Sequence, residues 1–283
     1  MDLESRFSLG DSVGRDELGE VFRAVEQGSG ARVALKRFDP WVVERQSAVE
    51  AYRQALLAHR ATQPCRTPAA AAFEISAGIG RLASRWVEGT TLADLLAQRE
   101  ALPIDEAASI ACGVLDALSE LHASGYAHGG ITPRKVLLVG GHTAGSVVLT
   151  DPFQHLLYAV DDPIKTSRTD PDRFLGLPEY FSPEQAQGER PSALSDVYVA
   201  GLLFYQMLTG KTPFAARSPS TTLKRQIYEK PLPPRYAKPG LRVPATCEET
   251  IARALSKEPG ERFGSAVELR AAVSALREGA TDE

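Results

Sequence analysis

Two glycines and a lysine near the N-terminus have the spacing of a phosphate-binding hairpin. Gly14 and Gly19 are separated by four residues, and Lys36 ends the run Val-Ala-Leu-Lys further along. A glycine-rich turn exposes backbone N–H groups to an anion, and a lysine on a neighbouring strand brings positive charge to the same place. The glycine pair alone is typical of ordinary turns. With Val21 and Lys36 at these distances, the pattern favours a site for phosphate groups.

Strands and helices of ordinary length must position these residues. Residues 7–38 alternate in strand fashion between turn signals. The predicted strands cover 7–13, 20–26 and 31–38. Residues 41–60 have the apolar spacing of a helix, and later helices are predicted over 103–121 and 265–278. The apolar run 197–208 is too short for a bilayer, where about 20 residues are needed, so we expect a buried core helix.

The composition excludes several function classes. The chain has 283 residues and a formal net charge of -4, so it lacks the basic surface of a general nucleic-acid-binding or anionic-membrane protein. Its cysteines, Cys65, Cys112 and Cys247, match no metal-ligand spacing and fit a reducing, cytoplasmic setting. The first residues contain no apolar signal segment. We expect a cytoplasmic globular protein with no membrane segment in this chain.

Residues 126–138 read Tyr-Ala-His-Gly-Gly-Ile-Thr-Pro-Arg-Lys-Val-Leu-Leu. They resemble the catalytic loop of protein kinases, whose pattern is H-R-D-L-K-P-x-N-V-L-L. In that family the Asp receives the proton of the substrate hydroxyl and the Asn holds a magnesium ion. The positions of the family's Arg, Asp, Lys and Asn carry Gly129, Gly130, Thr132 and Lys135. The resemblance therefore implies a loop that has lost its chemical groups.

The resemblance continues along the chain, in the order of the eukaryotic-like Ser/Thr kinases common in bacteria. The matching segments are 14–36 (glycine-rich loop and lysine strand), 82–96 (hinge), 151–153 (D-F-G), 176–184 (end of the activation segment) and 195–201 (S-D-V-Y-S-L-G). They imply an α+β, bilobal protein-kinase-like fold, with a small antiparallel β-sheet N-lobe carrying one main helix and a larger, mostly α-helical C-lobe. We expect the N-lobe and hinge over 1–87 and the C-lobe over 88–283, together one domain over 7–278.

The family positions imply two sets of functional residues. The nucleotide-binding set is Gly14, Gly19, Val21, Ala34, Lys36, Arg85, Trp86, Val87, Leu137 and Asp151. Asp151 is also the candidate metal ligand. The structural set is Glu184, Asp196 and Arg262. Asp196 is expected to anchor the backbone of the catalytic loop, and we predict an ion pair between Glu184 and Arg262.

Three positions depart from the family pattern near the predicted phosphate site. Asp16 replaces the middle glycine of the hairpin and brings a carboxylate toward the phosphates, where like charges repel. The glutamate that pairs with the family's lysine corresponds to Gln54, with Glu50 one turn earlier as the alternative. Lys135 either pairs with Asp151, in the place of a metal ion, or points to solvent.

Pro152 and Phe153 replace the last two residues of D-F-G. Proline removes a backbone N–H and fixes φ, and phenylalanine adopts positive φ only at a cost. We therefore predict a segment locked in one conformation. The candidate phosphorylation sites of the activation segment are Thr166, Ser167 and Thr169. Gly129 leaves a phosphate at these sites without its usual arginine partner.

These losses predict a pseudokinase, because positioning residues survive and the groups needed for phosphoryl transfer do not. We expect a signalling scaffold or regulatory binding module for a protein partner, such as an active kinase or a forkhead-associated domain. No cofactor is required, and ATP would bind weakly, with weak or no magnesium dependence. The alternative is a residual or atypical ATP-dependent Ser/Thr kinase, or another nucleotide transferase, in which Asp161 or Asp162 acts in place of Gly130.

Overall fold

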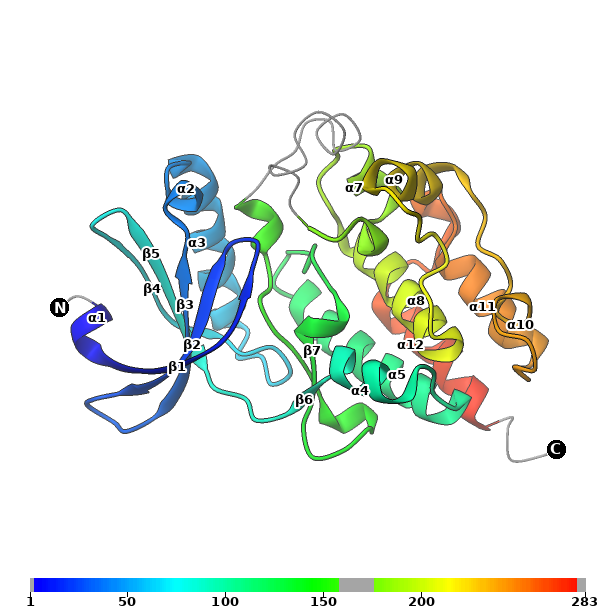
Figure 1. The fold of residues 1–283 in the computed structure, drawn as a ribbon, viewed down its shortest axis with the longest axis horizontal. Helices are drawn as coiled ribbons and strands as arrows, with labels where there is room; N and C mark the ends of the chain where they lie inside the picture. The colour runs from blue at the N-terminus through cyan, green and yellow to red at the C-terminus, as the bar shows by residue number, and fades with distance from the viewer. Residues whose placement is uncertain (1–2, 158–175, 279–283) are drawn as a thin grey trace.

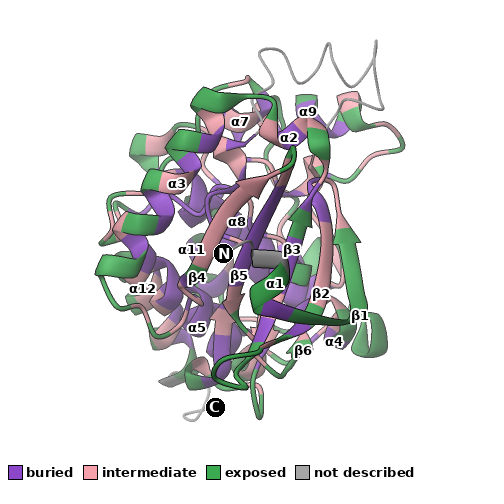
Figure 2. Ribbon diagram, turned by 90° about the vertical axis from the view of Figure 1, so that its left-hand side faces the viewer, coloured by how far each residue is buried: buried purple, intermediate pink, exposed green. Residues whose placement is uncertain are grey.

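The alternating strand patterns at the start of the chain build one antiparallel sheet. The computed structural model describes residues 3–157 and 176–278. The sheet follows a short helix, and these elements are α1 (Leu3–Arg6), β1 (Phe7–Asp16), β2 (Gly19–Glu26), β3 (Arg32–Phe38), β4 (Ala70–Ser76) and β5 (Ile79–Arg85). Their spatial order is β1-β2-β3-β5-β4. Figure 2 shows β3 and β5 buried at the centre of the sheet and β1 exposed at its edge. The three predicted strands are confirmed, with β1 extended as far as Asp16.

One main helix packs on this sheet. The helix predicted over 41–60 is divided into α2 (Pro40–Val43) and α3 (Gln46–Ala61). Helix α3 buries Val49, Tyr52 and Leu56. The Tyr52 ring meets the rings of Phe38 and Phe73 edge-on, with centroid distances of 6.0 and 5.5 Å. Such edge-to-face contacts fix the rotation of α3 about its axis and so decide which side chains it turns toward the sheet.

The described residues after β5 form the larger, helical lobe, on the right in Figure 1. Its strands β6 (Thr90–Thr91), β7 (Val136–Leu138) and β8 (Val147–Leu149) form a small antiparallel sheet. Its helices are α4 (Leu92–Arg99), α5 (Ile104–His122), α7 (Pro183–Ala186), α8 (Ala193–Thr209), α9 (Pro219–Tyr228), α10 (Pro234–Ala237), α11 (Ala245–Ala254) and α12 (Ala266–Glu278). Short 3-10 turns are η1 (Pro133–Lys135), η2 (Ala144–Ser146), η3 (Gln154–Leu156), η5 (Pro178–Tyr180) and η6 (Pro259–Glu261). The predicted fold class is confirmed. The domain boundary after residue 87, which falls between β5 and β6, stays a prediction.

Helix α8 is the centre of the helical lobe. Nearly every residue from Ser195 to Thr209 is buried, because α8 packs against α5, α11 and α12. A Cβ on Gly201 would lie 2.8 Å from the Ala254 Cβ, so the glycine allows α11 to approach closely. The buried core helix predicted over 197–208 is thereby confirmed. In the part of the chain that the structure describes, no helix combines the length and apolar character needed to cross a membrane.

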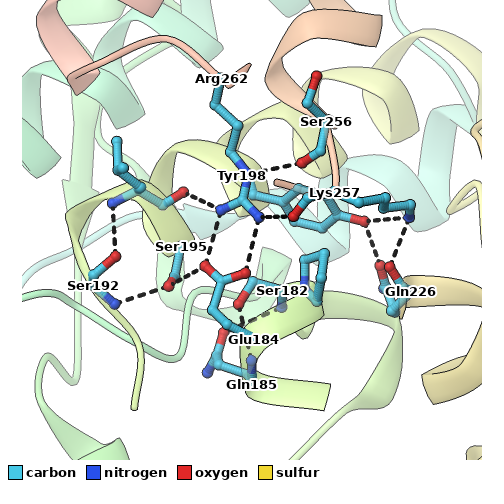
Figure 3. A network of polar contacts seen from close by, with 12 residues as sticks. Ser182, Glu184, Gln185, Ser192, Ser195, Tyr198, Gln226, Ser256, Lys257 and Arg262 are labelled. Carbon is cyan, nitrogen blue, oxygen red and sulfur yellow. Dashed lines mark hydrogen bonds and ion pairs between the residues drawn. The ribbon is translucent and has the colours of Figure 1, made fainter. Parts of the chain in front are cut away.

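A buried ion pair ties α7 to the loop before α12, as Figure 3 shows. The Arg262 Nη1 and Nη2 atoms donate to Glu184 Oε1 and Oε2, each at 2.9 Å, and the side chains are 0% and 10% exposed. Burial opposes ionisation of Glu184, yet hydrogen bonds from Arg262 and Ser195 hold its pKa below the ordinary value. The other Arg262 donors reach the carbonyl oxygens of Leu194, Ser256 and Lys257. The predicted ion pair between Glu184 and Arg262 is confirmed.

Removing one partner of this pair should destabilise the fold severely. We expect Arg262→Met to lower the free energy of unfolding by about 3–5 kcal/mol, because Glu184 is left buried with an uncompensated charge. Urea denaturation at neutral pH, followed by circular dichroism, makes the measurement. The control is Arg37→Met, which breaks an exposed pair with Glu20 at 3.4 Å and should cost less than about 1 kcal/mol. Equal losses in the two variants would contradict the structural role of Arg262.

Candidate functional site

Five polar side chains meet where the sheet lobe faces the helical lobe. We call Asp16, Lys36, Lys135, Asp151 and Gln154 the interlobe cluster. Lys36, on β3, is 2% exposed. Its ammonium forms an ion pair with Asp16 Oδ2 and lies 3.8 Å from Asp151 Oδ1. Because Asp151 follows β8 in the helical lobe, Lys36 connects the two lobes.

The Asp16 carboxylate uses the groups that a phosphate would use. Its Oδ1 accepts hydrogen bonds from the N–H groups of Leu18 at 3.0 Å and Gly19 at 3.2 Å, while Oδ2 binds the Lys36 ammonium. Burial alone would raise the pKa of Asp16, but Lys36 and the Leu18 N–H hold it below its ordinary value. The carboxylate is therefore ionised at neutral pH and lies in the backbone cradle of its own hairpin.

The two glycines of the hairpin differ in their surroundings. A Cβ on Gly19 would lie 2.1 Å from the Arg37 carbonyl oxygen, so a side chain there would force β2 away from β3. A Cβ on Gly14 would meet nothing within 4 Å. Sheet packing is thus a sufficient reason for Gly19, independent of any phosphate. Val21 pairs with Lys36 in the β2–β3 register, which places it beside the interlobe cluster.

The prediction that Gln54 or Glu50 faces Lys36 is wrong. Both lie on the exposed face of α3, where Gln54 Nε2 donates to Glu50 Oε1 at 2.6 Å. Tyr52 takes the inward position with 0% exposure. Burial and the carboxylates of the interlobe cluster raise its pKa well above the ordinary value. Successive helical residues are about 100° apart, so a two-residue error in alignment exchanges the buried face for the exposed one.

Lys135 is buried, and the alternative in which it points to solvent is wrong. It ends η1, is 8% exposed, and donates from Nζ to Gln154 Oε1 at 2.8 Å. The other alternative fails too, because the ion pairs of the described residues do not include one between Lys135 and Asp151. Burial lowers the pKa of Lys135, and the charge of Asp151 opposes that shift. An ammonium held by a neutral amide thus lies at the family's metal-ligand position.

Phe153 adopts a positive φ in spite of the cost expected for a phenylalanine. Asp151 and Phe153 have φ values of 55° and 66°. The Phe153 ring is 0% exposed and meets the rings of His59 and Tyr126 at 5.5 and 5.6 Å. Burying a phenylalanine contributes about 1.5–3 kcal/mol, which offsets the about 1–2 kcal/mol that a left-handed residue costs. Packing between the lobes therefore decides this backbone conformation.

Asp196, in α8, holds the loop after α5 by its backbone. Its two carboxylate oxygens accept hydrogen bonds from the N–H groups of His128 at 2.7 Å and Gly129 at 2.9 Å. The His122 Nε2–H donates to the same carboxylate at 2.8 Å. Burial would raise the pKa of Asp196, but His122 and the loop keep it below the ordinary value. Burial lowers the pKa of His128 to about 4, so its ring is neutral at physiological pH.

Gly129 leaves no room for the arginine of the family pattern. Its φ is 67°, in the left-handed region, and a Cβ would lie 2.1 Å from His155 Nδ1. That Nδ1–H donates to the His128 carbonyl oxygen at 3.1 Å. The ring of His155 thus fills the space into which an arginine side chain would extend. Gly130 and Thr132 follow in the same loop, half-buried, and neither supplies a carboxylate.

The hinge candidates lie between β5 and β6. Arg85 ends β5 and is exposed. The Trp86 backbone N–H donates to the Arg32 carbonyl oxygen at 3.2 Å, and its indole N–H donates to Glu88. The ring of Trp86 lies 5.0 Å from the guanidinium carbon of Arg23. The remaining nucleotide-binding candidates, Ala34, Val87 and Leu137, are half-buried.

The interlobe cluster does not fit a magnesium ion. Magnesium prefers near-octahedral oxygen coordination, whereas the cluster places two ammonium groups beside two carboxylates. Asp151, the candidate ligand, lies 3.8 Å from the Lys36 ammonium. Within residues 3–157 and 176–278, no three His, Cys, Asp or Glu side chains come together as a metal site. The donor set of the cluster therefore does not favour a divalent cation.

Three residues of this region are missing from the sequence prediction: Tyr52, Gln154 and His155. The apolar spacing of α3 contained a signal for Tyr52, which lies three residues after the buried Val49. Gln154 and His155 had no such signal, since their roles depend on how η3 packs against the loop after α5. The predicted activation-segment sites Thr166, Ser167 and Thr169, and the substitute acids Asp161 and Asp162, lie outside the described residues.

Comparison with known proteins identifies the family of the chain. Residues 7–273 match the family model described as protein kinase domain. The chain is 29% identical over 267 residues to serine/threonine-protein kinase pkn3 of Myxococcus xanthus, covering 93% of this chain and 48% of that protein. It is 30% identical over 288 residues to serine/threonine-protein kinase PknB of Mycobacterium leprae, covering 99% and 44%. The chain thus spans about half the length of the curated relatives it matches.

A solved structure shows the same fold. The PknI kinase domain of Mycobacterium tuberculosis superposes with a TM-score of 0.73 and 20% identity, covering 96% of both chains. At this identity the likeness establishes the protein kinase fold alone. The family model reaches further, because it extends from β1 into α12 and includes the hairpin, the lysine strand, the loop after α5 and the Glu184–Arg262 pair. The chain belongs to the protein kinase domain family.

Proposed function

We propose that the chain is a pseudokinase, a kinase-shaped module that binds a protein partner without transferring phosphate. The observation that carries the proposal is the Asp16 carboxylate, which binds the hairpin N–H groups and the Lys36 ammonium. An incoming phosphate must displace this carboxylate before it can reach either group. The chain thus places its own anion where a nucleotide would bind.

The loop after α5 supports the same proposal. Gly130 stands where the family places the proton-accepting Asp, and loss of a positioned acid/base group costs about 10²- to 10⁴-fold in rate. Lys135 stands where the family's Asn holds a metal ion, and its ammonium repels a cation. Such effects are not additive within one site. Both nevertheless act against phosphoryl transfer.

The charge balance of the interlobe cluster supports weak, metal-independent ATP binding at most. Two carboxylates, Asp16 and Asp151, are matched by two ammonium groups, Lys36 and Lys135. A divalent cation would add positive charge beside both lysines. When a nucleotide binds without metal, its phosphate replaces the Asp16 carboxylate beside Lys36, and one anion takes the place of another. The proposed function therefore requires no cofactor.

The partner that we propose is a protein, in the class of an active kinase or a forkhead-associated domain. The support is the selective retention of architecture, since the buried Glu184–Arg262 pair and the Asp196 anchor persist around a loop without catalytic groups. Both contacts stabilise the kinase fold itself, and a stable fold that lacks catalytic groups can act through its surface.

A residual ATP-dependent kinase is the second candidate function. One contact favours it, because Lys36 and Asp151, the two retained family groups that would act on phosphate and metal, lie 3.8 Å apart. In this case the Asp16 carboxylate would have to move away from the N–H groups of Leu18 and Gly19 before each turnover. The relatives named above are serine/threonine-protein kinases, which keeps this alternative open to direct test.

Asp16 should keep nucleotide binding to the wild-type chain weak. We expect about 2 mM ATP to raise the wild-type Tm by less than about 1 °C, with or without magnesium, because a ligand stabilises only a state that it binds. The same ATP should raise the Tm of Asp16→Gly by about 3 °C or more. Differential scanning fluorimetry with ATP, ATP plus magnesium, and magnesium alone makes the measurement.

The matched control for this experiment is Asp11→Gly, an exposed acid in the same strand. It should behave as the wild type does. The gain in Asp16→Gly should disappear in Asp16→Gly/Lys36→Met, since the freed cradle then lacks its cation. A magnesium-dependent rise in the wild-type Tm would show that the family's metal-nucleotide site is intact and would rule out the self-occupied site.

The wild-type chain should not transfer phosphate. With radiolabelled ATP and magnesium, we expect label on the chain itself and on a generic protein substrate to stay at the level of a heat-denatured sample. The reason is the absence of a proton acceptor at Gly130 and of a metal ligand at Lys135. Label that appears in the wild type and is lost in Lys36→Ala would establish the residual kinase instead.

A further inference from the structure

A groove beside the hinge takes no part in the interlobe site. Its cavity measures about 230 Å³, and its walls include Ser8 of β1, Arg23 and Val25 of β2, Arg32 of β3 and Trp86 of the hinge. Arg32 lies four residues before Lys36 on β3, a separation of about 13 Å along a strand. The groove is thus a separate surface at the far end of the same strands.

The sheet register places two arginines and a valine on one wall of the groove. Val25 pairs with Arg32, and Arg23 pairs with Ala34. Cross-strand partners and every second residue share a face of a sheet, so Arg23, Val25 and Arg32 point to the same side. Val25 is 41% exposed. The Trp86 ring lies 5.0 Å from the Arg23 guanidinium carbon, and an apolar wall therefore adjoins the charged one.

The two groove arginines differ from other arginines of the sheet lobe. Arg6, Arg15 and Arg37 each form an ion pair with a carboxylate of the same lobe. Among the described residues, no carboxylate forms an ion pair or a side-chain hydrogen bond with Arg23 or Arg32. The Glu88 carboxylate accepts the indole N–H of Trp86, and the charges of Arg32 and Arg23 also act to lower its pKa. Two guanidinium groups thus share one carboxylate, and the groove keeps excess positive charge.

From this geometry we infer that the groove binds an acidic, extended peptide segment of a protein partner. An apolar side chain of the segment packs against Trp86 and Val25, and flanking carboxylates bind Arg23 and Arg32. A guanidinium matches a carboxylate in shape as well as charge, which favours this pairing over a general attraction. The cavity is smaller than the about 300–1,000 Å³ of typical small-molecule pockets, so it suits a side chain of a peptide better than a whole ligand.

This inference rests on the proposed binding-module function and adds the chemistry of the partner. The test uses an array of end-blocked decapeptides, each with a central Leu or Phe flanked by Asp and Glu. A matched array carries Lys in place of the acids. Binding is followed by the fluorescence of Trp86 in a Trp41→Phe background, which leaves Trp86 as the tryptophan of the chain. No nucleotide is present, so the result does not depend on the interlobe site.

We expect acidic peptides to bind with Kd values of about 10–100 μM and the lysine array to show no binding. Arg23→Ala/Arg32→Ala should weaken binding at least about tenfold, and higher salt should weaken it as well. The matched control is Arg37→Ala, an exposed arginine on the same strand as Arg32, which should change the Kd less than about twofold. Both arginines of the double variant are exposed, so the fold should persist, and a thermal melt checks this.

Three outcomes would overturn the inference: equal binding of the two arrays, an equal effect of Arg37→Ala, or no binding of any acidic peptide. Inorganic phosphate is the competitor in a displacement experiment. If phosphate displaces every acidic peptide at about the Kd of phosphate for the groove, near the millimolar range, the groove is assigned to small anions instead. Acidic peptides that bind a chain which also transfers label from ATP would uphold the groove and reject the pseudokinase. A chain that transfers no label from ATP and binds no acidic peptide would uphold the pseudokinase and reject the groove.

Discussion

The ion pair between Asp16 and Lys36 is the interaction on which the interlobe site depends. A buried ammonium needs a nearby negative charge, because the cost of removing it from water is otherwise not recovered. Helix α3 turns Tyr52 inward, and a neutral phenol cannot supply that charge. Asp16 and Asp151 supply it instead. The contact of Asp16 with the hairpin N–H groups thus accompanies the neutralisation of Lys36, to which α3 presents no carboxylate.

The need to neutralise Lys36 also explains why the two lobes contact each other through their own side chains. In an active kinase, nucleotide and metal ions fill the space between the lysine strand and the D-F-G aspartate. Here Lys36 reaches Asp151 directly, Lys135 binds Gln154, and the Phe153 ring packs beneath α3 against His59. Contacts that a ligand would make are replaced by contacts within the protein. The charged side chains of the interlobe cluster thus have partners within the chain.

Local patterns in the sequence were sufficient for the framework. The strands around Lys36 follow from alternation and turn residues, and α8 follows from a continuous apolar run. The Glu184–Arg262 pair was expected from the family positions of the two residues. The inward residue of α3 was not predictable in this way, because helical rotation is set by the contact of Tyr52 with two aromatic rings of the sheet. The partner of Lys135 and the left-handed Phe153 depend on packing between distant segments, which spacing does not encode.

The close approach of Gly129 and His155 couples these two positions of the chain. An arginine at 129 would collide with the His155 ring, and a smaller residue at 155 would leave the His128 carbonyl oxygen without that donor. Either substitution alone therefore disturbs the loop, the first by a steric clash and the second by the loss of a hydrogen bond. An arginine at 129 thus requires a coordinated change at 155.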